Sequence, residues 1–204
     1  PCYSRRLYVA SGILSAGLHR HRRSTFSVSA LQGCEPSHAP DFMNPEIFTQ
    51  PLTKDSFAPF GEILDASGSP DRLINAGKCG RHHDLATLDF GQDGQAGISI
   101  FNARPRSLPY MLDLLERHPE GSQAFLPMTG HPFLVIVAPD DGGIPGTPLA
   151  FITHPYQGVN FRRGTWHGVL TPLAEPGLFA VFDRIGTTTN LDEYPLDPPY
   201  VIKG

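Results

Sequence analysis

The pair Trp166-His167 is the place in the sequence where the residue types most clearly allow chemistry. It lies in the stretch Gln157–Leu170, where apolar and polar residues alternate on both sides of Gly164. Alternation with a period of two predicts half-buried strands, and the glycine predicts a turn between them. Because successive strand residues face opposite sides, His167 can face a cavity and transfer protons there while Trp166 packs behind it. The alternative is an ordinary hairpin whose polar side chains face solvent.

A second stretch, Glu116–Pro127, gathers titratable and amide side chains in the order Glu-Arg-His-Pro-Glu-Gly-Ser-Gln-Ala-Phe-Leu-Pro. Together with Gln-Gly-Val-Asn-Phe…Trp-His of the first stretch, it resembles the ureidoglycolate lyase family, the enzymes of allantoin breakdown that split ureidoglycolate into glyoxylate and urea. The resemblance extends from Gln50 to Asn190. Shorter matches are Ile74–Gly77, His83–Ala86, Phe133–Ala138 and Phe182–Arg184.

The resemblance implies an all-β fold, a cupin-type double-stranded β-helix (jelly-roll barrel) with one or two short helices. Such barrels enclose a pocket that suits a small ligand. Their edge strands need covering, and the resemblance also implies a homodimer. The 21 glycines, 21 prolines and short alternating runs agree with many short antiparallel strands.

The resemblance also implies the activity of a carbon–nitrogen lyase of the amidine-lyase class, which eliminates urea from (S)-ureidoglycolate to give glyoxylate. The residues leave two alternatives open: a metal-dependent cupin isomerase or oxygenase, and a non-catalytic cupin that binds a small metabolite. They also do not separate the lyase from an ammonia-releasing hydrolase. One departure bears on activity, since Gly168-Val169 stands where many family members have His-Pro.

Cupins often hold a metal through two histidines and an acid in one motif and a third histidine in another. On this resemblance the metal ligands map onto Glu116, His118, Gln123 and His167. Glu116 and His118 are two residues apart, so on a strand they share a face. Carboxylate, amide and imidazole suit Ni²⁺ or Mn²⁺ better than tetrahedral zinc, and the resemblance points to Ni²⁺. The alternative is that His118 and Gln123 hydrogen-bond the substrate or one another.

Ureidoglycolate carries a carboxylate, a hydroxyl and a ureido nitrogen. Releasing urea requires a proton to leave the hydroxyl and a proton to reach the departing nitrogen. We expect His167 to transfer these protons, with His83 and His118 as catalytic alternatives. The carboxylate needs a cation or convergent N–H donors. The candidate substrate-binding residues are Asn75, Arg81, Asp84, Gln123, Asn160 and Arg184, of which Arg184 could instead pair with Asp183 or Asp192.

Composition limits the kinds of partner. Hydrophobic residues make up 40% and charged residues 18% of the 204 residues, as in soluble globular proteins. No run of eighteen apolar residues occurs, so no membrane partner is expected. Five of the 16 basic residues precede Glu35, which leaves 11 basic against 20 acidic residues beyond them, a balance that disfavours nucleic acid. Three widely spaced cysteines favour a reducing compartment over a disulfide framework.

The first 40 residues differ from the rest, which predicts a tail (1–40) followed by the cupin domain (41–204). The tail is rich in arginine and serine and has no acidic residue before Glu35, a composition typical of a mitochondrial transit peptide. A disordered basic tail is the alternative. The predicted location is therefore cytoplasmic or mitochondrial, and not secreted.

Period-two patterns predict the elements that position these residues. We expect a helical turn within Pro51–Gly61 and a loop at Asp140–Gly146 that joins two halves of a sheet. Leu108–Arg117 fits either a strand or a helix. Strands are predicted at Glu62–Leu64, Arg81–Phe90, Ile98–Asn102, Phe125–Pro127, Phe133–Ala138, Leu149–Ile152 and Gly177–Asp183.

Overall fold

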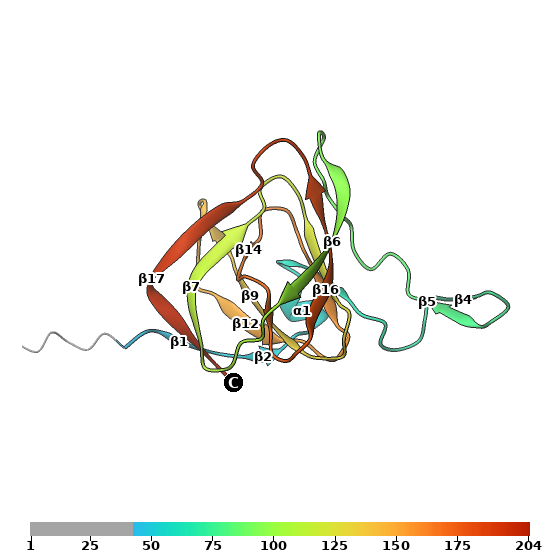
Figure 1. Ribbon diagram of the computed structural model, residues 1–204, viewed down its shortest axis with the longest axis horizontal. Helices are drawn as coiled ribbons and strands as arrows, with labels where there is room; N and C mark the ends of the chain where they lie inside the picture. Colours follow the sequence, from blue (N-terminus) through green and yellow to red (C-terminus); the bar gives the residue numbers. More distant parts are fainter. Residues whose placement is uncertain (1–42) are drawn as a thin grey trace, which may run out of the picture. The chain divides into compact units, whose positions relative to one another are not determined.

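Almost all regular structure in the described part of the chain is β-strand (Figure 1). The computed structural model describes residues 43–204, and the only helix among them is α1 (Lys54–Phe57). The strands form two large sheets and two short hairpins. The predicted all-β, cupin-type barrel with a short helix is therefore confirmed. Within the described residues, no helix has the length and apolar character needed to cross a membrane. The predicted tail, residues 1–40, lies outside this range.

The larger sheet curls into a nearly closed barrel, seen in the left half of Figure 1. In spatial order its strands are β1 (Glu46–Phe48), β17 (Asp192–Lys203), β7 (Tyr110–Arg117), β14 (Trp166–His167), β9 (Phe133–Ala138), β12 (Leu149–Ile152) and β2 (Gln50–Pro51), with β15 (Thr171–Pro172) also beside β9. Only Thr49 separates β1 from β2 in the sequence, so the two edges of the sheet are joined by the chain itself.

The smaller sheet lies against one side of this barrel. Its strands are β3 (Gly61–Leu64), β13 (Gly158–Phe161), β8 (Gln123–Pro127), β16 (Gly177–Ile185) and β6 (Gln95–Ala103), in that order. The two hairpins are β4 (Arg72–Ile74) with β5 (Cys79–Arg81), and β10 (Asp140–Asp141) with β11 (Ile144–Pro145).

Strand β9 separates two apolar cores, because all six of its residues are buried. Phe133, Val135 and Val137 belong to the first core, which lies between the two sheets. The alternate residues of β9 belong to the second core, inside the curled larger sheet. Successive side chains near the ends of β9, β7 and β14 therefore point alternately into the first core and into the second core.

The short helix fixes an aromatic cluster in the first core. Thr53 caps it, since its side chain accepts the backbone N–H of Ser56. The helix places Phe57, which is fully buried, against Phe151 and Phe161, with ring centroids 6.4 and 6.0 Å away. Helix and cluster thus support the end of β13 that leads to Trp166-His167.

Most predicted strands lie within observed ones, and Leu108–Arg117 adopts the strand alternative as β7. Asp140–Gly146 is a loop that contains the β10–β11 hairpin. The strand predicted at Arg81–Phe90 was wrong beyond Arg81, because this segment bonds side chains of the smaller sheet instead of a neighbouring strand. Strand β17 was not predicted from the sequence, because its three prolines cannot donate ladder hydrogen bonds and argue against a strand.

Candidate active site

His167 on β14 lies directly opposite Glu116 on β7 and Val137 on β9. Opposite residues of an antiparallel pair share a face, so Glu116 and His167 face the first core with Val137. Trp166 enters the second core, where its Nε1 donates to Asp140 Oδ1 at 2.9 Å. The predicted placement of Trp166 and His167 on opposite faces is confirmed.

The imidazole of His167 is buried in an apolar setting. Only 1% of the residue is exposed, and the ring stacks on Phe161. Its Nδ1 lies 3.1 Å from the carbonyl oxygen of Gly168, which can only accept, whereas Nε2 is buried and has no hydrogen-bond partner among residues 43–204. Burial, together with the nearby His118, lowers the pKa of His167 to about 3, although the Gly168 bond acts in the opposite direction. His167 is therefore neutral near pH 7, with a free lone pair on Nε2.

His118 follows the end of β7 and lies between the backbone and Gln123. Its Nδ1 is 2.6 Å from the carbonyl oxygen of Asn190, so Nδ1 carries the hydrogen. Its Nε2 is 3.1 Å from Gln123 Oε1, and its ring centroid is 5.3 Å from that of His167. The two imidazoles and the amide thus converge on one point, where two acceptor atoms, Nε2 of His118 and Oε1 of Gln123, face each other.

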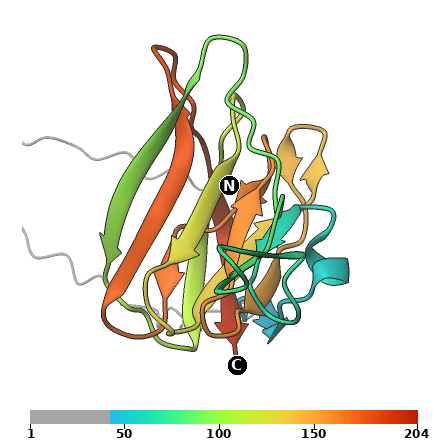
Figure 2. The same ribbon diagram turned by 90° about the vertical axis from the view of Figure 1, so that its right-hand side faces the viewer.

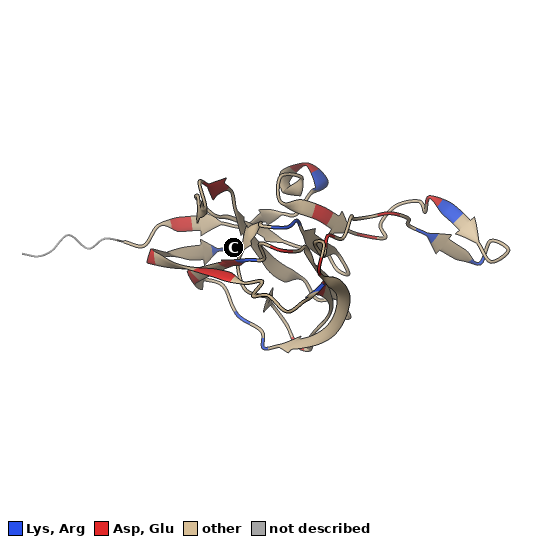
Figure 3. Ribbon diagram, turned by 90° about the horizontal axis from the view of Figure 1, so that it is seen from above, with Lys and Arg blue, Asp and Glu red and all other residues tan. Residues whose placement is uncertain are grey.

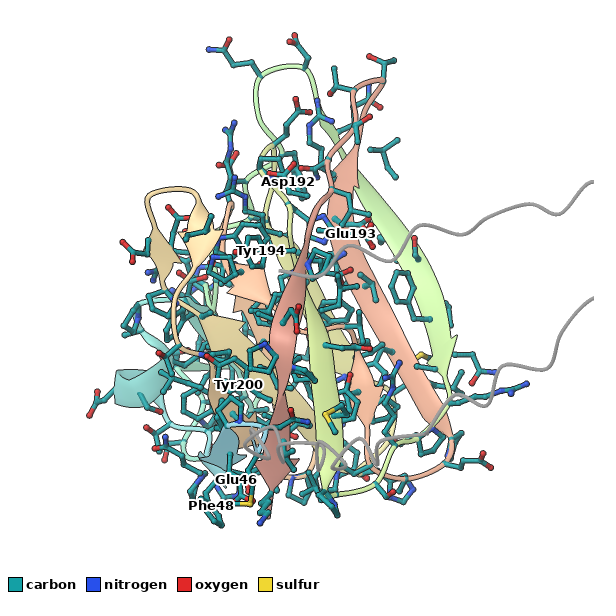
Figure 4. All side chains as sticks on the ribbon, turned by 90° about the vertical axis from the view of Figure 1, so that its left-hand side faces the viewer. Glu46, Phe48, Asp192, Glu193, Tyr194 and Tyr200 are labelled. Atoms are coloured by element: carbon teal, nitrogen blue, oxygen red, sulfur yellow. The ribbon has the colours of Figure 1, made fainter. Side chains whose placement is uncertain are left out.

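Glu116 completes the cluster. Burial raises the pKa of its carboxyl group; His118 lowers it and Glu193 raises it further. Glu193 faces Glu116 from the upper part of β17, close to Asp192 (Figure 4). One ligand atom from each of Glu116, His118 and His167 lies within 4.8 Å of the others. The side chain of Glu116 is 20% exposed, so solvent reaches the cluster along this side.

These donors fit a divalent metal ion. The partnerless Nε2 of His167 is a buried lone pair, a group that costs stability unless something binds it. Two imidazoles, one carboxylate and the amide oxygen of Gln123 are the ligand types of Ni²⁺ or Mn²⁺. The residues Glu116, His118, Gln123 and His167 are brought together, while the presence and the identity of a metal ion stay predictions.

The sequence model of the family described as ureidoglycolate lyase matches residues 44–203. The chain belongs to the ureidoglycolate lyase family. It is 60% identical to the ureidoglycolate lyase of Rhodobacter capsulatus, over 78% of this chain and 98% of that protein. It is 51% identical to that of Chelativorans sp. (77% and 96%) and 47% identical to ureidoglycolate lyase 2 of Rhizobium meliloti (76% and 95%). The predicted family is confirmed, and with it the prediction of a lyase.

These comparisons correct the predicted mitochondrial location. The relatives named are bacterial proteins, and bacteria have no mitochondria. The basic composition of residues 1–40 was therefore a misleading signal. The match to the family also begins only at residue 44, so it does not include these residues.

Two of the predicted substrate-binding residues, Asn160 and Arg184, lie apart from the cluster formed by Glu116, His118, Gln123 and His167. Asn160 is on the opposite face of β13 from Phe161, where its Nδ2 donates to Glu62 Oε2 and to the carbonyl oxygen of Thr87. Arg184 donates to the carbonyl oxygen of Phe90 and forms an ion pair of 3.1 Å with Glu120. Neither of the acidic partners considered for Arg184, Asp183 or Asp192, forms an ion pair with it among the described residues.

The other predicted residues gather around the β4–β5 hairpin, which projects from the barrel (Figure 1). Asn75 is in its turn, with a φ of 54°, and Arg81 ends β5. Arg81 Nη2 donates to His83 Nδ1 at 2.9 Å, and the backbone N–H of His83 donates to Asp71. Asp84 follows with a φ of 56°. The structure thus groups Asn75, Arg81, His83 and Asp84 on a different element from Glu116 and His167.

Sequence reasoning missed the ring that supports His167. Phe161 stacks on His167 with 1° between the planes, and Asn190 holds His118 through its backbone carbonyl. Phe161 had a signal, because it lies on the inward side of the alternation that precedes Gly164. For Asn190 the sequence contains no such signal, because every residue has a backbone carbonyl.

Proposed function

We propose that Glu116, His118, Gln123 and His167 form the active site at which this chain eliminates urea from (S)-ureidoglycolate, leaving glyoxylate, in allantoin breakdown. The observation that supports this site most directly is the convergence of ligand atoms of Glu116 on β7, His118 directly after β7 and His167 on β14 within 4.8 Å of one another. Two stretches far apart in the sequence meet there.

The reaction moves one proton from the substrate hydroxyl to the departing nitrogen while the carbon–nitrogen bond breaks and a carbonyl forms. Glu116 suits this relay, because burial raises the pKa of its carboxyl group towards the range where it can take and return a proton. His167 suits it less, since a histidine with a pKa of about 3 offers a lone pair near pH 7 and no proton. The structure therefore favours Glu116 as the proton carrier and His167 as an acceptor or ligand.

The same residues would hold the predicted nickel ion. The ligands would be Nε2 of His118 and His167, one oxygen of Glu116, and the amide oxygen of Gln123. A bound ion would act as a Lewis acid that stabilises negative charge on the substrate oxygens. A carboxylate has two oxygens, so Glu116 can hold a proton on the other one.

The products of the purified full-length chain test this function. Incubation with ureidoglycolate should release urea and glyoxylate in equal amounts, whereas ammonia without urea would indicate the hydrolase. Glu116→Gln should lower kcat by about 10²–10⁴, the usual contribution of a general acid or base. Glu193→Gln is the matched control, because Glu193 is exposed and lies opposite Glu116 on β17, and it should keep most activity.

We also propose that two copies associate through the outer face of the smaller sheet, which Figure 2 views from outside. Phe101 points inward to Phe125, with ring centroids 6.0 Å apart, so the alternate residues of β6 point outward. On β6, Ile98 (70%) and Ile100 (59%) are large, apolar and exposed, as are Leu126 (38%) on the nearby strand β8 and Met128 (56%) directly after it. A contiguous patch of this kind marks an association surface.

Light scattering across micromolar concentrations should give the mass of a dimer. Ile100→Asp should shift the mass towards the monomer. Ile144→Asp, a change on the exposed β11, should leave it unchanged. A monomer mass for the unaltered chain would exclude the dimer.

A further inference from the structure

The β4–β5 hairpin, residues 72–81 and here called the arm, has too little structure to be stable alone. Its two strands have three residues each and form a sheet of their own. Every residue of the arm except Ile74 is exposed, including Leu73 at 64%. A lone two-stranded hairpin is marginal in water, so the arm is shaped for a surface that it does not meet within residues 43–204.

The charge of the arm indicates what that surface is. Arg72 lies directly opposite Arg81 in the ladder, and like charges in this position destabilise a hairpin unless an anion lies between them. With Lys78 the arm carries three basic residues and no acidic one, and none of the three forms an ion pair within residues 43–204. The nearest polar partner of Arg81 is the imidazole of His83. The arm therefore suits an acidic partner.

The rest of the same domain is acidic (Figure 3). Two of the 20 acidic residues, Glu35 and Asp41, precede the described part, which leaves 18 against 11 basic residues. The arm holds three of those 11, so eight basic residues remain against 18 acidic ones elsewhere. A second copy of this chain thus offers the complementary charge.

The candidate active site lacks the group that the arm could supply. Ureidoglycolate carries a carboxylate, yet the converging side chains are one carboxylate, one amide and two imidazoles. The arginines beside them are engaged elsewhere. Arg117 stacks on Trp166 and pairs with Asp140 and Asp192, and Arg184 pairs with Glu120.

We propose that the arm of one copy lies across the active site of a second copy, where Arg81, flanked by Arg72, binds the substrate carboxylate. The inference rests on the proposed function. In a two-fold dimer the exchange is reciprocal, so each site is completed by its partner. A guanidinium binds a carboxylate through two parallel N–H bonds, which would also orient the substrate.

Mixed dimers test this directly. Arg81→Ala should lower kcat/KM at least about thirtyfold, as expected for the loss of one partner of a buried charge pair. His167→Asn damages the other half of the site. When the two full-length variants are co-expressed with different tags, one site of each mixed dimer has an intact arm and an intact barrel. Random association should then restore about one quarter of the unaltered turnover.

The control pair is Glu116→Gln with His167→Asn. Both changes lie in the barrel, so no mixed dimer of theirs should recover activity. If tagged mixed dimers of Arg81→Ala and His167→Asn form and stay inactive, the arm does not complete a partner's site. Arg81→Lys, which keeps the charge but not the fork, should retain more activity than Arg81→Ala.

Cross-linking gives a second readout that does not depend on turnover. Cys79 is exposed on the arm, and Glu193→Cys places a thiol beside the site, in a full-length chain whose Cys2 and Cys34 are changed to Ser. A short bismaleimide should join two chains only when both thiols are present. If the unaltered chain releases no urea, the proposed function fails while the cross-link still reports the arm. A confirmed dimer without the cross-link overturns the arm placement.

Discussion

Phe161 and His167 lie face to face across the turn at Gly164, with ring centroids 4.3 Å apart and 1° between their planes. Phe161 is itself held by Phe57 of the capped helix, at 6.0 Å between ring centroids. One face of the imidazole is therefore sealed by an apolar ring. Water is excluded from it, and this is the main reason why the pKa of His167 falls to about 3.

The lowered pKa makes stability depend on pH. Below the ordinary pKa of 6.5 the unfolded chain binds a proton at His167 and the folded chain does not. The contribution of His167 is thus complete above pH 6.5 and is lost as the pH falls towards 3, with a slope of at most about 1.4 kcal/mol per pH unit. Urea denaturation of metal-free protein between pH 4 and 7 should show a flatter profile for His167→Asn than for the unaltered chain.

Glu116 changes the stability in the opposite direction. Because its pKa is raised, its contribution to stability falls as the pH rises above 4.5. The unaltered chain and His167→Asn share this term to a first approximation, so their difference isolates His167. Parallel profiles for the two proteins would show that His167 titrates normally.

Trp166 should contribute to stability more than to catalysis. It is 2% exposed in the second core, and removing such a ring costs about 3–5 kcal/mol. We expect Trp166→Ala to lower the free energy of unfolding by about that amount. Trp166→Phe, which keeps a ring but loses the bond to Asp140, should cost less. A fall in kcat with unchanged stability in Trp166→Phe would place the indole in the reaction instead.

His167→Asn should leave folding at pH 7 almost intact and lower turnover. The sequence-based role, proton transfer, and the ligand role favoured by the structure both predict this loss, so metal affinity decides between them. Calorimetric titration with Ni²⁺ should show weaker binding for His167→Asn and for His118→Ala than for Arg106→Ala, a change away from the ligand set. Equal Ni²⁺ affinity in all three variants would exclude the ligand role and leave proton transfer as the role of His167.

Asn160 should prove structural. It is fully buried, and its amide joins Glu62 to the carbonyl of Thr87, so Asn160→Ala should cost about 1–3 kcal/mol through the partners left unbonded. Its KM and kcat should stay near those of the unaltered chain. A large rise in KM without loss of stability would restore its predicted role in substrate binding.

Residues 1–42 should be dispensable. The match to the family begins at residue 44, and one relative is covered over 98% of its length without a counterpart of that segment. A chain of residues 43–204 should keep the melting temperature and the turnover of the full chain. A large loss of either would show that the segment packs on the domain.

Local pattern alone gave part of the site. The period-two alternation around Gly164 placed Trp166 and His167 on opposite faces, because the direction of a side chain on a strand depends only on its position in the strand. The same rule placed Glu116, near the end of β7, and His118, directly after β7, on one side of the chain. The motifs in these two stretches also indicated the family, with its all-β fold and a candidate set of metal ligands.

Only the tertiary structure decided which interior each face meets. The same alternation that turns Phe161 towards His167 turns Asn160 away, and no local signal says that the far side of β13 is covered by the segment around Thr87. The proline-rich β17 became visible as a strand only through its pairing with β7. The pKa of His167 depends on burial by residues distant in the chain, and burial is a property of the packed fold that no stretch of sequence contains.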